Sequence, residues 1–170
     1  MEQEKLFDRS AGALIEYCRT HGLTVATAES CTGGLIASLL TDVPGSSAVV
    51  MGGCVAYTNE VKQAVLRVPA SVISEHTEVS APCAAAMAEG ARRLMGASLA
   101  VSTTGYAGPG GGNEKNPVGT VYLAIASRTG TVTKRFEAPV GSSRTEVKRL
   151  AALFAISLLL ESARENESRP

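Results

Sequence analysis

The chain has 170 residues, a length that fits one globular domain, and 45% of them are hydrophobic against 19% that are charged. Sixteen basic residues balance sixteen acidic ones, so no net positive field would attract a polyanion, and we expect no nucleic-acid partner. No apolar run is long enough to cross a bilayer and no signal-peptide pattern is present, so we expect a cytoplasmic protein without a membrane partner.

The first half of the chain predicts alternating helices and strands. Apolar residues at near-helical spacing, β-branched runs and Gly or Pro-Gly punctuation mark the boundaries. In chain order we expect a helix ending at Gly22, a strand over 23–28, a helix over 35–40 and a strand over 48–57. The glycine turn 29–34 therefore joins a strand to a helix.

The second half predicts two helices, three strands and a last helix. Thr58 is expected to N-cap a helix that carries Lys62, and Ser80 to open a helix that stops at Gly96. Strands over 99–104, 118–127 and 131–138 follow, the last two as a hairpin, and the final helix begins with a capping-box pattern at 143–146. This order predicts one α/β domain over 5–165, with a disordered tail over 166–170.

The cysteines and histidines give no metal-binding pattern. Cys18, Cys31, Cys54 and Cys83 lack CxxC spacing, which indicates reduced thiols rather than a disulfide framework or a zinc site. The two histidines lie at a helix end and in a polar connector, so neither is expected to be a general base or a metal ligand.

The glycine turn after the first strand is one candidate binding segment. Its residues Ser30, Thr32, Gly33 and Gly34 open a helix, and exposed backbone N–H groups at a helix start suit a phosphate. The pattern is neither a Walker loop nor GxGxxG, so a turn that only reverses the chain would look the same. Cys31 lies in this turn, but its neighbours favour a packed residue over a nucleophile.

A second candidate is the loop 108–112, in which four of five residues are glycine. It follows a predicted strand, where α/β proteins tend to place ligand-binding loops. A flexible connector is the alternative. Ordering so many glycines costs backbone entropy, so close approach of a ligand to the backbone explains them at least as well.

Three residues around the second strand form a workable acyl-transfer set. Ser47 follows a Pro-Gly turn, while Tyr57 and Lys62 bracket the next strand-to-helix junction. A desolvated lysine can be neutral, accept the serine proton and later protonate leaving ammonia. A turn serine, a half-buried tyrosine and a solvated lysine would explain the same residues without any chemistry.

Thr104 and Arg144 are the remaining candidates. Thr104 ends a predicted strand beside the glycine loop. Arg144 lies in the first turn of the last helix, where its charge opposes the helix dipole, which suggests pairing with a phosphate or carboxylate. A solvated surface arginine is the alternative reading.

Five segments become specific in combination. They are AESCTGG at 28–34, TDVPGSS at 41–47, YTNEVK at 57–62, TGYAGPGGG at 104–112 and PVGTVY at 117–122. In this order they resemble the CinA C-terminal domain family, in its stand-alone, PncC-like form without a nucleotide-pyrophosphatase-type N-terminal domain. The resemblance covers residues 5–165 and implies a three-layer α/β/α sandwich with a mixed central sheet.

The resemblance also implies an activity. It is hydrolysis of nicotinamide mononucleotide to nicotinic acid mononucleotide and ammonia, a pyridine-nucleotide salvage step with no metal and no cofactor. Family members commonly self-associate, so a homo-oligomer is expected. A module of the competence or DNA-damage response that binds a nucleotide or protein without turnover is the alternative, and a different nucleotide amide as substrate is a third.

The site residues implied by the resemblance have distinct expected roles. Ser47 would be the nucleophile, Lys62 its base and Tyr57 a proton relay, with Ser30 and Cys31 as other possible nucleophiles. Thr104 and nearby backbone N–H groups would steady the amide oxygen, and Arg144 with the 30–34 turn would hold the phosphate. Gly105, Gly108 and Gly110 would line the substrate. Tyr106, where the family pattern has an aliphatic residue, and the 113–116 stretch are departures that bear on substrate fit.

Overall fold

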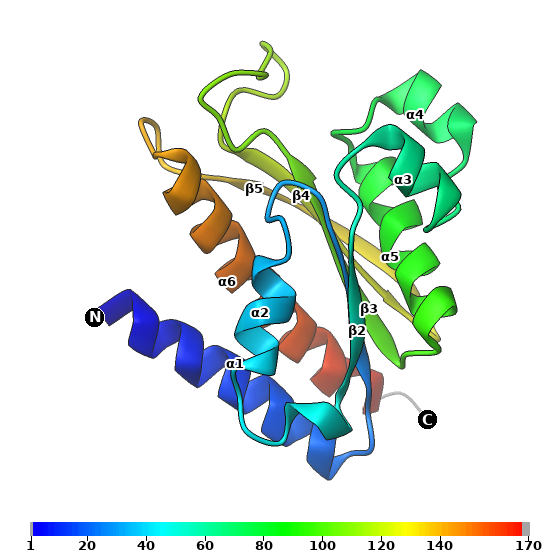
Figure 1. The fold of residues 1–170 in the computed structure, drawn as a ribbon, viewed down its shortest axis with the longest axis vertical. Helices are drawn as coiled ribbons and strands as arrows, with labels where there is room; N and C mark the ends of the chain where they lie inside the picture. Colours follow the sequence, from blue (N-terminus) through cyan, green and yellow to red (C-terminus); the bar gives the residue numbers. More distant parts are fainter. Residues whose placement is uncertain (1, 168–170) are drawn as a thin grey trace.

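The computed structural model describes the backbone of residues 2–167 and the side chains of residues 10–165. Its strands form one five-stranded sheet in the order β2-β1-β3-β4-β5 (Figure 1). They are β1 (Val25–Glu29), β2 (Val50–Val55), β3 (Leu99–Gly105), β4 (Thr120–Ser127) and β5 (Gly130–Glu137). β1 pairs in parallel with β2 and β3, while β4 and β5 are antiparallel. The predicted mixed sheet is confirmed.

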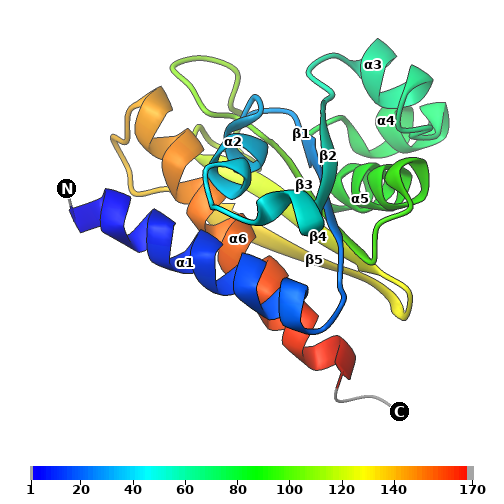
Figure 2. The same cartoon turned by 60° about the horizontal axis from the view of Figure 1, so that its bottom comes forward.

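Helices cover both faces of this sheet, as Figures 1 and 2 show. One face carries α1 (Glu2–Thr20), α2 (Leu35–Thr41) and α6 (Arg144–Glu167), and the other α3 (Asn59–Ala64), α4 (Ala70–His76) and α5 (Ala81–Met95). This confirms the three-layer α/β/α arrangement. Within the described residues, none of the helices has the length and apolar character needed to span a membrane.

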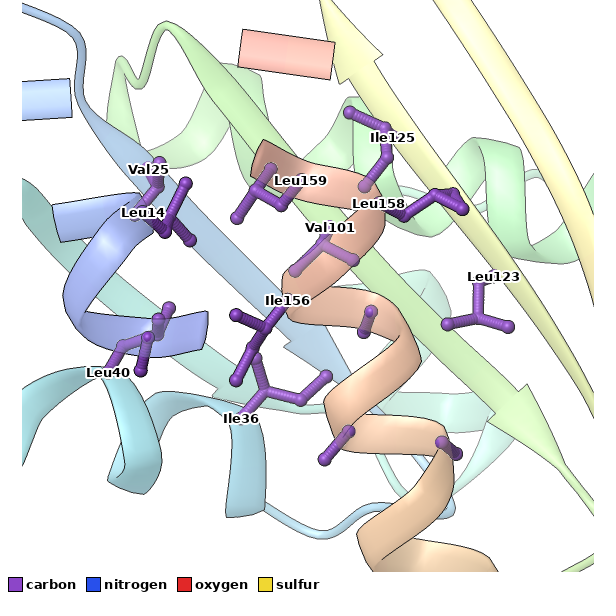
Figure 3. Close-up of a cluster of buried hydrophobic side chains, with 14 of the residues drawn as sticks. Leu14, Val25, Ile36, Leu40, Val101, Leu123, Ile125, Ile156, Leu158 and Leu159 are labelled. Carbon is purple, nitrogen blue, oxygen red and sulfur yellow. The ribbon is translucent and has the colours of Figure 1, made fainter. Parts of the chain in front are cut away.

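The main core lies between the sheet and the α1, α2 and α6 layer. Leu14, Ile36, Leu40, Ile156 and Leu159 are fully buried there and point toward one another from three helices (Figure 3). Part of the opposite face is built from small side chains, since α5 packs alanines against alanines of β4 there. The chain has few aromatic residues, and small side chains let α5 pack close to the sheet instead.

Local capping chemistry sets the predicted helix boundaries. Thr58 accepts a hydrogen bond at the start of α3, Ser80 does so at the start of α5, and Gly96 ends α5 in the left-handed region. Ser143 and Glu146 form the reciprocal capping box, because Glu146 Oε2 accepts from Ser143 N at 2.7 Å and Ser143 Oγ accepts from Glu146 N at 3.3 Å. These boundaries are confirmed.

Two short elements differ from the predicted order. The structure has α4 and a 3-10 turn, η1 (Ser46–Ala48), where the sequence predicts only connectors. α4 has no fully buried residue, so it lacks the apolar periodicity that would reveal it. At the other end of the chain α6 continues to Glu167, and residues 168–170 of the predicted tail lie outside the described residues.

Gly90 allows α5 to pack closely against the chain that follows α3. Adding one carbon at this position should therefore lower the stability of the fold. A Cβ on Gly90 would lie 2.1 Å from the Leu66 carbonyl oxygen, so Gly90→Ala must displace backbone. We expect it to lower the free energy of unfolding by roughly 3 kcal/mol, measured by urea denaturation. The matched control is Gly12→Ala in α1, where nothing lies within 4 Å.

The Gly12→Ala control should raise the stability, by up to about 1 kcal/mol, because alanine is the better helix former. Equal stability of the two variants would contradict the close α5 contact.

Candidate active site

A cleft opens where β1, β2 and β3 end. In open α/β sheets ligands bind outside the carboxyl ends of the strands, at the point where strand order reverses, and β1 lies between β2 and β3. The cleft is lined by Ser30, Cys31, Tyr57, Lys62, Glu78, Val79, Thr104, Gly105, Tyr106, Ala107 and Arg144. Backbone hydrogen bonds continue one step past β1, since Ala56 N donates to Glu29 O at 2.8 Å and Ser30 N to Thr103 O at 2.9 Å.

Lys62 is the most unusual residue in the cleft. It extends from α3, and only 1% of its surface is exposed. Its Nζ contacts Ala56 O at 2.9 Å, Tyr57 O at 3.3 Å and Ser30 Oγ at 3.1 Å. Burial lowers the pKa of the Lys62 amine below its ordinary value, and the nearby Cys83 and Glu78 side chains partly offset this. A lysine in this setting gives up its proton more readily than a solvated one.

Ser30 is the hydroxyl that the structure brings to Lys62. It is the first residue after β1 and begins the turn into α2, with 8% of its surface exposed. The neighbouring Cys31 is also buried, and burial raises the pKa of its thiol to about 12. Since the thiolate is the nucleophilic form of cysteine, Cys31 is a poor nucleophile here. The serine hydroxyl is the better placed of the two.

A buried carboxylate holds the turn that carries Ser30. Glu29 is fully buried at the end of β1, and its Oε2 accepts from Gly34 N at 3.0 Å and Ile36 N at 3.0 Å. Its Oε1 accepts from Ala37 N at 2.8 Å. These donors are the N–H groups that the first turn of a helix leaves without partners. Glu29 therefore caps α2 and fixes the direction of the chain at Ser30.

This cap corrects the expected phosphate site at the 30–34 turn. The N–H groups that would bind a phosphate already donate to a carboxylate, and a second anion there would be repelled by the first. The Thr32 hydroxyl is also used internally, since it lies 2.7 Å from both Glu29 Oε2 and Thr103 Oγ1. Of this set, Ser30 is the residue that lines the cleft, while Gly33 is exposed beside it.

Ser47 does not reach the cleft, which corrects the expected Ser47–Lys62 pair. It is exposed in η1, before the first residue of β2, whereas Lys62 follows the last residue of β2. A strand of this length spans about 20 Å at ~3.3 Å per residue, so the two side chains lie at opposite ends of the sheet. The Pro-Gly turn before Ser47 serves to start β2.

Arg144 joins two other predicted residues at the rim of the cleft. Its Nη2 donates to the Tyr57 hydroxyl at 3.0 Å, and its Nη1 donates to Gly108 O at 2.7 Å. Tyr57 is 58% exposed, so this side of the cleft faces solvent. The segment after β2, the glycine loop and α6 thus meet around one guanidinium group.

The remaining predicted residues divide between packing and the cleft. Thr104 Oγ1 donates to Glu78 O at 2.6 Å, so this hydroxyl anchors the segment before α5. Gly105 has no room for a side chain, since a Cβ would lie 2.4 Å from Thr120 O in β4. Gly110 is exposed in the outer part of the loop and does not line the cleft.

Three charged residues near the cleft are missing from the sequence-based set. Glu29 could have been found as a charged residue at the end of a buried strand. Lys148 lies four residues after Arg144 and therefore on the same face of α6, with its Nζ 3.5 Å from the point where a Cβ would stand on Gly33. Glu78 has no local sequence signal. Among residues 10–165 no group of three His, Cys, Asp or Glu side chains could hold a metal ion.

The fold is a three-layer α/β/α sandwich, and its polar cleft lies at the switch point of the central sheet. A buried lysine beside a serine in this cleft is a pair of groups suited to acyl transfer. Residues 8–163 match the CinA C-terminal domain, and the chain belongs to that family. It is 48% identical over 156 residues to the CinA-like protein of Myxococcus xanthus, covering 92% of this chain and 36% of the relative. The chain thus spans about a third of the length of the curated relatives it matches.

Solved structures show the same fold. The competence/damage inducible protein CihA from Agrobacterium tumefaciens is 40% identical with a TM-score of 0.89, covering 92% of this chain and 94% of that one. A CinA superfamily protein from Klebsiella pneumoniae is 32% identical with a TM-score of 0.89, covering 94% and 98%.

The Glu29 cap predicts a large stability cost for a small chemical change. Glu29→Gln keeps the shape but turns an NH₂ group toward at least one backbone donor, leaving that donor buried and unpaired. We expect a loss of about 3 kcal/mol in the free energy of unfolding by chemical denaturation.

Glu16→Gln, which removes an exposed carboxylate paired with Arg19 on α1, is the control and should cost no more than about 0.5 kcal/mol. If both variants unfold like the wild type, Glu29 does not hold the turn.

Proposed function

We propose that this chain hydrolyses the carboxamide of nicotinamide mononucleotide, releasing ammonia, with Ser30 as the nucleophile and Lys62 as its base. The observation that carries the proposal is the 3.1 Å contact between Ser30 Oγ and the buried Lys62 Nζ at the cleft. The resemblance of its motifs to nicotinamide-nucleotide amidases supplies the substrate, and the family match supports that choice.

Lys62 is oriented to accept a proton from Ser30. In the neutral amine two N–H bonds can point at Ala56 O and Tyr57 O, which leaves the lone pair toward Ser30 Oγ. Ser30 Oγ then forms a bond to the carboxamide carbon as its proton passes to Lys62. The charged Lys62 returns that proton to the amide nitrogen, and the C–N bond breaks to release ammonia.

Water completes the cycle by the same route. It attacks the resulting ester carbon while Lys62 takes one of its protons, and the bond to Ser30 Oγ breaks as the proton moves back to that oxygen. The products are the free Ser30 hydroxyl and nicotinic acid mononucleotide. Atoms and charges balance with water as the only second substrate.

Backbone groups at the cleft can stabilise the oxygen that gains charge. The N–H groups of Cys31 and Ala107 make no hydrogen bond to another residue within the described part of the chain, and both residues line the cleft. The N–H of the residue after a nucleophile is a common oxyanion donor. This assignment replaces the Thr104 hydroxyl, which bonds to Glu78 O.

Cations on α6 are suited to the phosphate of the substrate. Arg144 lines the cleft, and Lys148 lies four residues later on the same helix face, near the exposed Gly33. Tyr57 accepts a hydrogen bond from Arg144, so we assign it to orienting the guanidinium group rather than to relaying a proton. Arginine binds phosphate through paired N–H donors, and its orientation fixes the position of the bound nucleotide.

Substitution of the pair tests the proposal directly. Ser30→Ala and Lys62→Met should each lower the release of ammonia from nicotinamide mononucleotide about 1000-fold or more, since residues that act as a unit fail together. The measurement follows ammonia and nicotinic acid mononucleotide, with circular dichroism to check the fold.

Ser47→Ala is the matched serine control and should keep full activity, because Ser47 lies at the opposite end of β2. Cys31→Ser should keep most activity as well. An active Ser30→Ala variant, or an inactive Ser47→Ala variant, would overturn the assignment.

The lowered pKa of Lys62 predicts the pH dependence. As a general base Lys62 must be neutral, so kcat/KM should rise with pH as its proton is lost. Because burial lowers its pKa, this rise should come at a lower pH than the 10.5 of an ordinary lysine.

A pH–rate profile measures the position of this rise, and the exposed Lys134→Met variant should leave it unchanged. A rise at the ordinary lysine value would show that Lys62 is not the titrating base.

A binding module without turnover is the second candidate, and the descriptions of the solved relatives as competence or damage-inducible proteins favour it. Absence of product at high protein concentration, with retained binding of nicotinamide mononucleotide, would support this role. The expected homo-oligomer and cytoplasmic location stay predictions.

A further inference from the structure

The cleft contains one negative charge that the chemistry above does not use. Glu78 is half-buried in the connection between α4 and α5 and lines the cleft together with Lys62 and Tyr106. Among the described residues its carboxylate has no hydrogen-bond or ion-pair partner, whereas its backbone oxygen accepts from Thr104 Oγ1 at 2.6 Å. The segment is therefore anchored while the charged group is left available.

Backbone strain accompanies this placement. Thr77, directly before Glu78, has φ 66 and ψ 168, a conformation that a β-branched residue rarely adopts. Ser80 Oγ donates to Thr77 O at 2.9 Å, and Thr77 N donates to Ile73 O at 2.9 Å, so the strained residue is held from both sides. Strain of this kind clusters at functional sites.

The negative charge of Glu78 favours the protonated form of Lys62, which opposes the role of Lys62 as a base. It raises the pKa of Lys62 against the larger effect of burial, and it adds to the rise in the pKa of Tyr106 caused by burial. A carboxylate that keeps a general base protonated slows the chemical step. The carboxylate of Glu78, which lines the cleft and has no partner among the described residues, is instead available to a bound substrate.

We propose that Glu78 and the neighbouring Tyr106 ring form the subsite for the positively charged pyridinium ring of the substrate. This rests on the proposed function, because the ring of nicotinamide mononucleotide carries a fixed positive charge and its phosphate a negative one. Glu78 then matches the ring while Arg144, which also lines the cleft, matches the phosphate.

Tyr106 lines the cleft and also contacts the glycine loop. A Cβ on Gly111 would lie 3.1 Å from Tyr106 Cδ1, so the glycine loop packs on this ring. A tyrosine face attracts a cation, and a carboxylate beside it adds a direct charge pair. The subsite selects a cationic ring over a neutral ring of the same shape.

The test compares Glu78→Gln with the wild type on nicotinamide mononucleotide and on its reduced form, whose dihydropyridine ring is neutral. We expect kcat/KM for the cationic substrate to fall about tenfold, while that for the neutral one changes less than about twofold, because loss of one near charge affects only the charged ring. Each substrate is its own reference, so their different reactivities cancel. Measurements are made at a pH where Lys62 is neutral in both proteins.

Glu75→Gln is the matched control, since Glu75 is exposed on α4 and does not line the cleft. It should change neither value. An equal fall for both substrates with Glu78→Gln, or no fall for either, would overturn the subsite.

A binding measurement keeps the subsite testable apart from turnover. In the Ser30→Ala protein, 1-methylnicotinamide, a cation, should bind more tightly than neutral nicotinamide by NMR titration, and Glu78→Gln should abolish that difference. If the wild type fails to hydrolyse nicotinamide mononucleotide but the difference depends on Glu78, the proposed function fails and the subsite stands. If the two ligands bind alike, the subsite is wrong whatever the activity.

Discussion

The buried carboxylate of Glu29 is the constraint on which the candidate site depends. It accepts from Gly34, Ile36 and Ala37 backbone N–H groups, so the start of α2 is fixed to the end of β1. Ser30, the next residue, donates its backbone N–H to Thr103 O, and the Glu29 carbonyl before it accepts from Ala56 N. A hydroxyl in a free loop would sample many positions, whereas the position of the Ser30 hydroxyl is fixed by β1, by α2 and by the Glu29 carboxylate that joins them.

The same strand ends determine what Lys62 can do. Its two carbonyl partners, Ala56 and Tyr57, immediately follow β2, so the sheet itself fixes the amine opposite Ser30. Burial of the amine raises the cost of its charge, and the backbone oxygens accept its N–H bonds in either protonation state. Packing and hydrogen bonding therefore act together on Lys62, because burial disfavours its charge while the backbone oxygens fix its position.

Elements whose signals are local could be predicted from the sequence. The strand-turn-helix unit at 23–40, the caps at Thr58 and Ser80 and the 128–130 hairpin depend on neighbouring residues and appear as expected. The sequence does not predict α4, because the helix follows Pro69 and only Val72 and Ile73 are partly buried, too few to give an apolar period.

The errors in the site arise where distant residues decide the outcome. Chemistry alone predicts that Ser47 pairs with Lys62, but only the folded sheet shows that β2 separates them. The sequence predicts free N–H groups in the 30–34 turn, but the Glu29 carboxylate in the same motif already accepts from them.

The buried Cys31 thiol, with its pKa raised to about 12, has a further consequence. Peroxide oxidises the thiolate form of cysteine to sulfenic acid, so the protonated Cys31 thiol resists this reaction. A site whose reacting group is the Ser30 hydroxyl therefore keeps that group under oxidative stress.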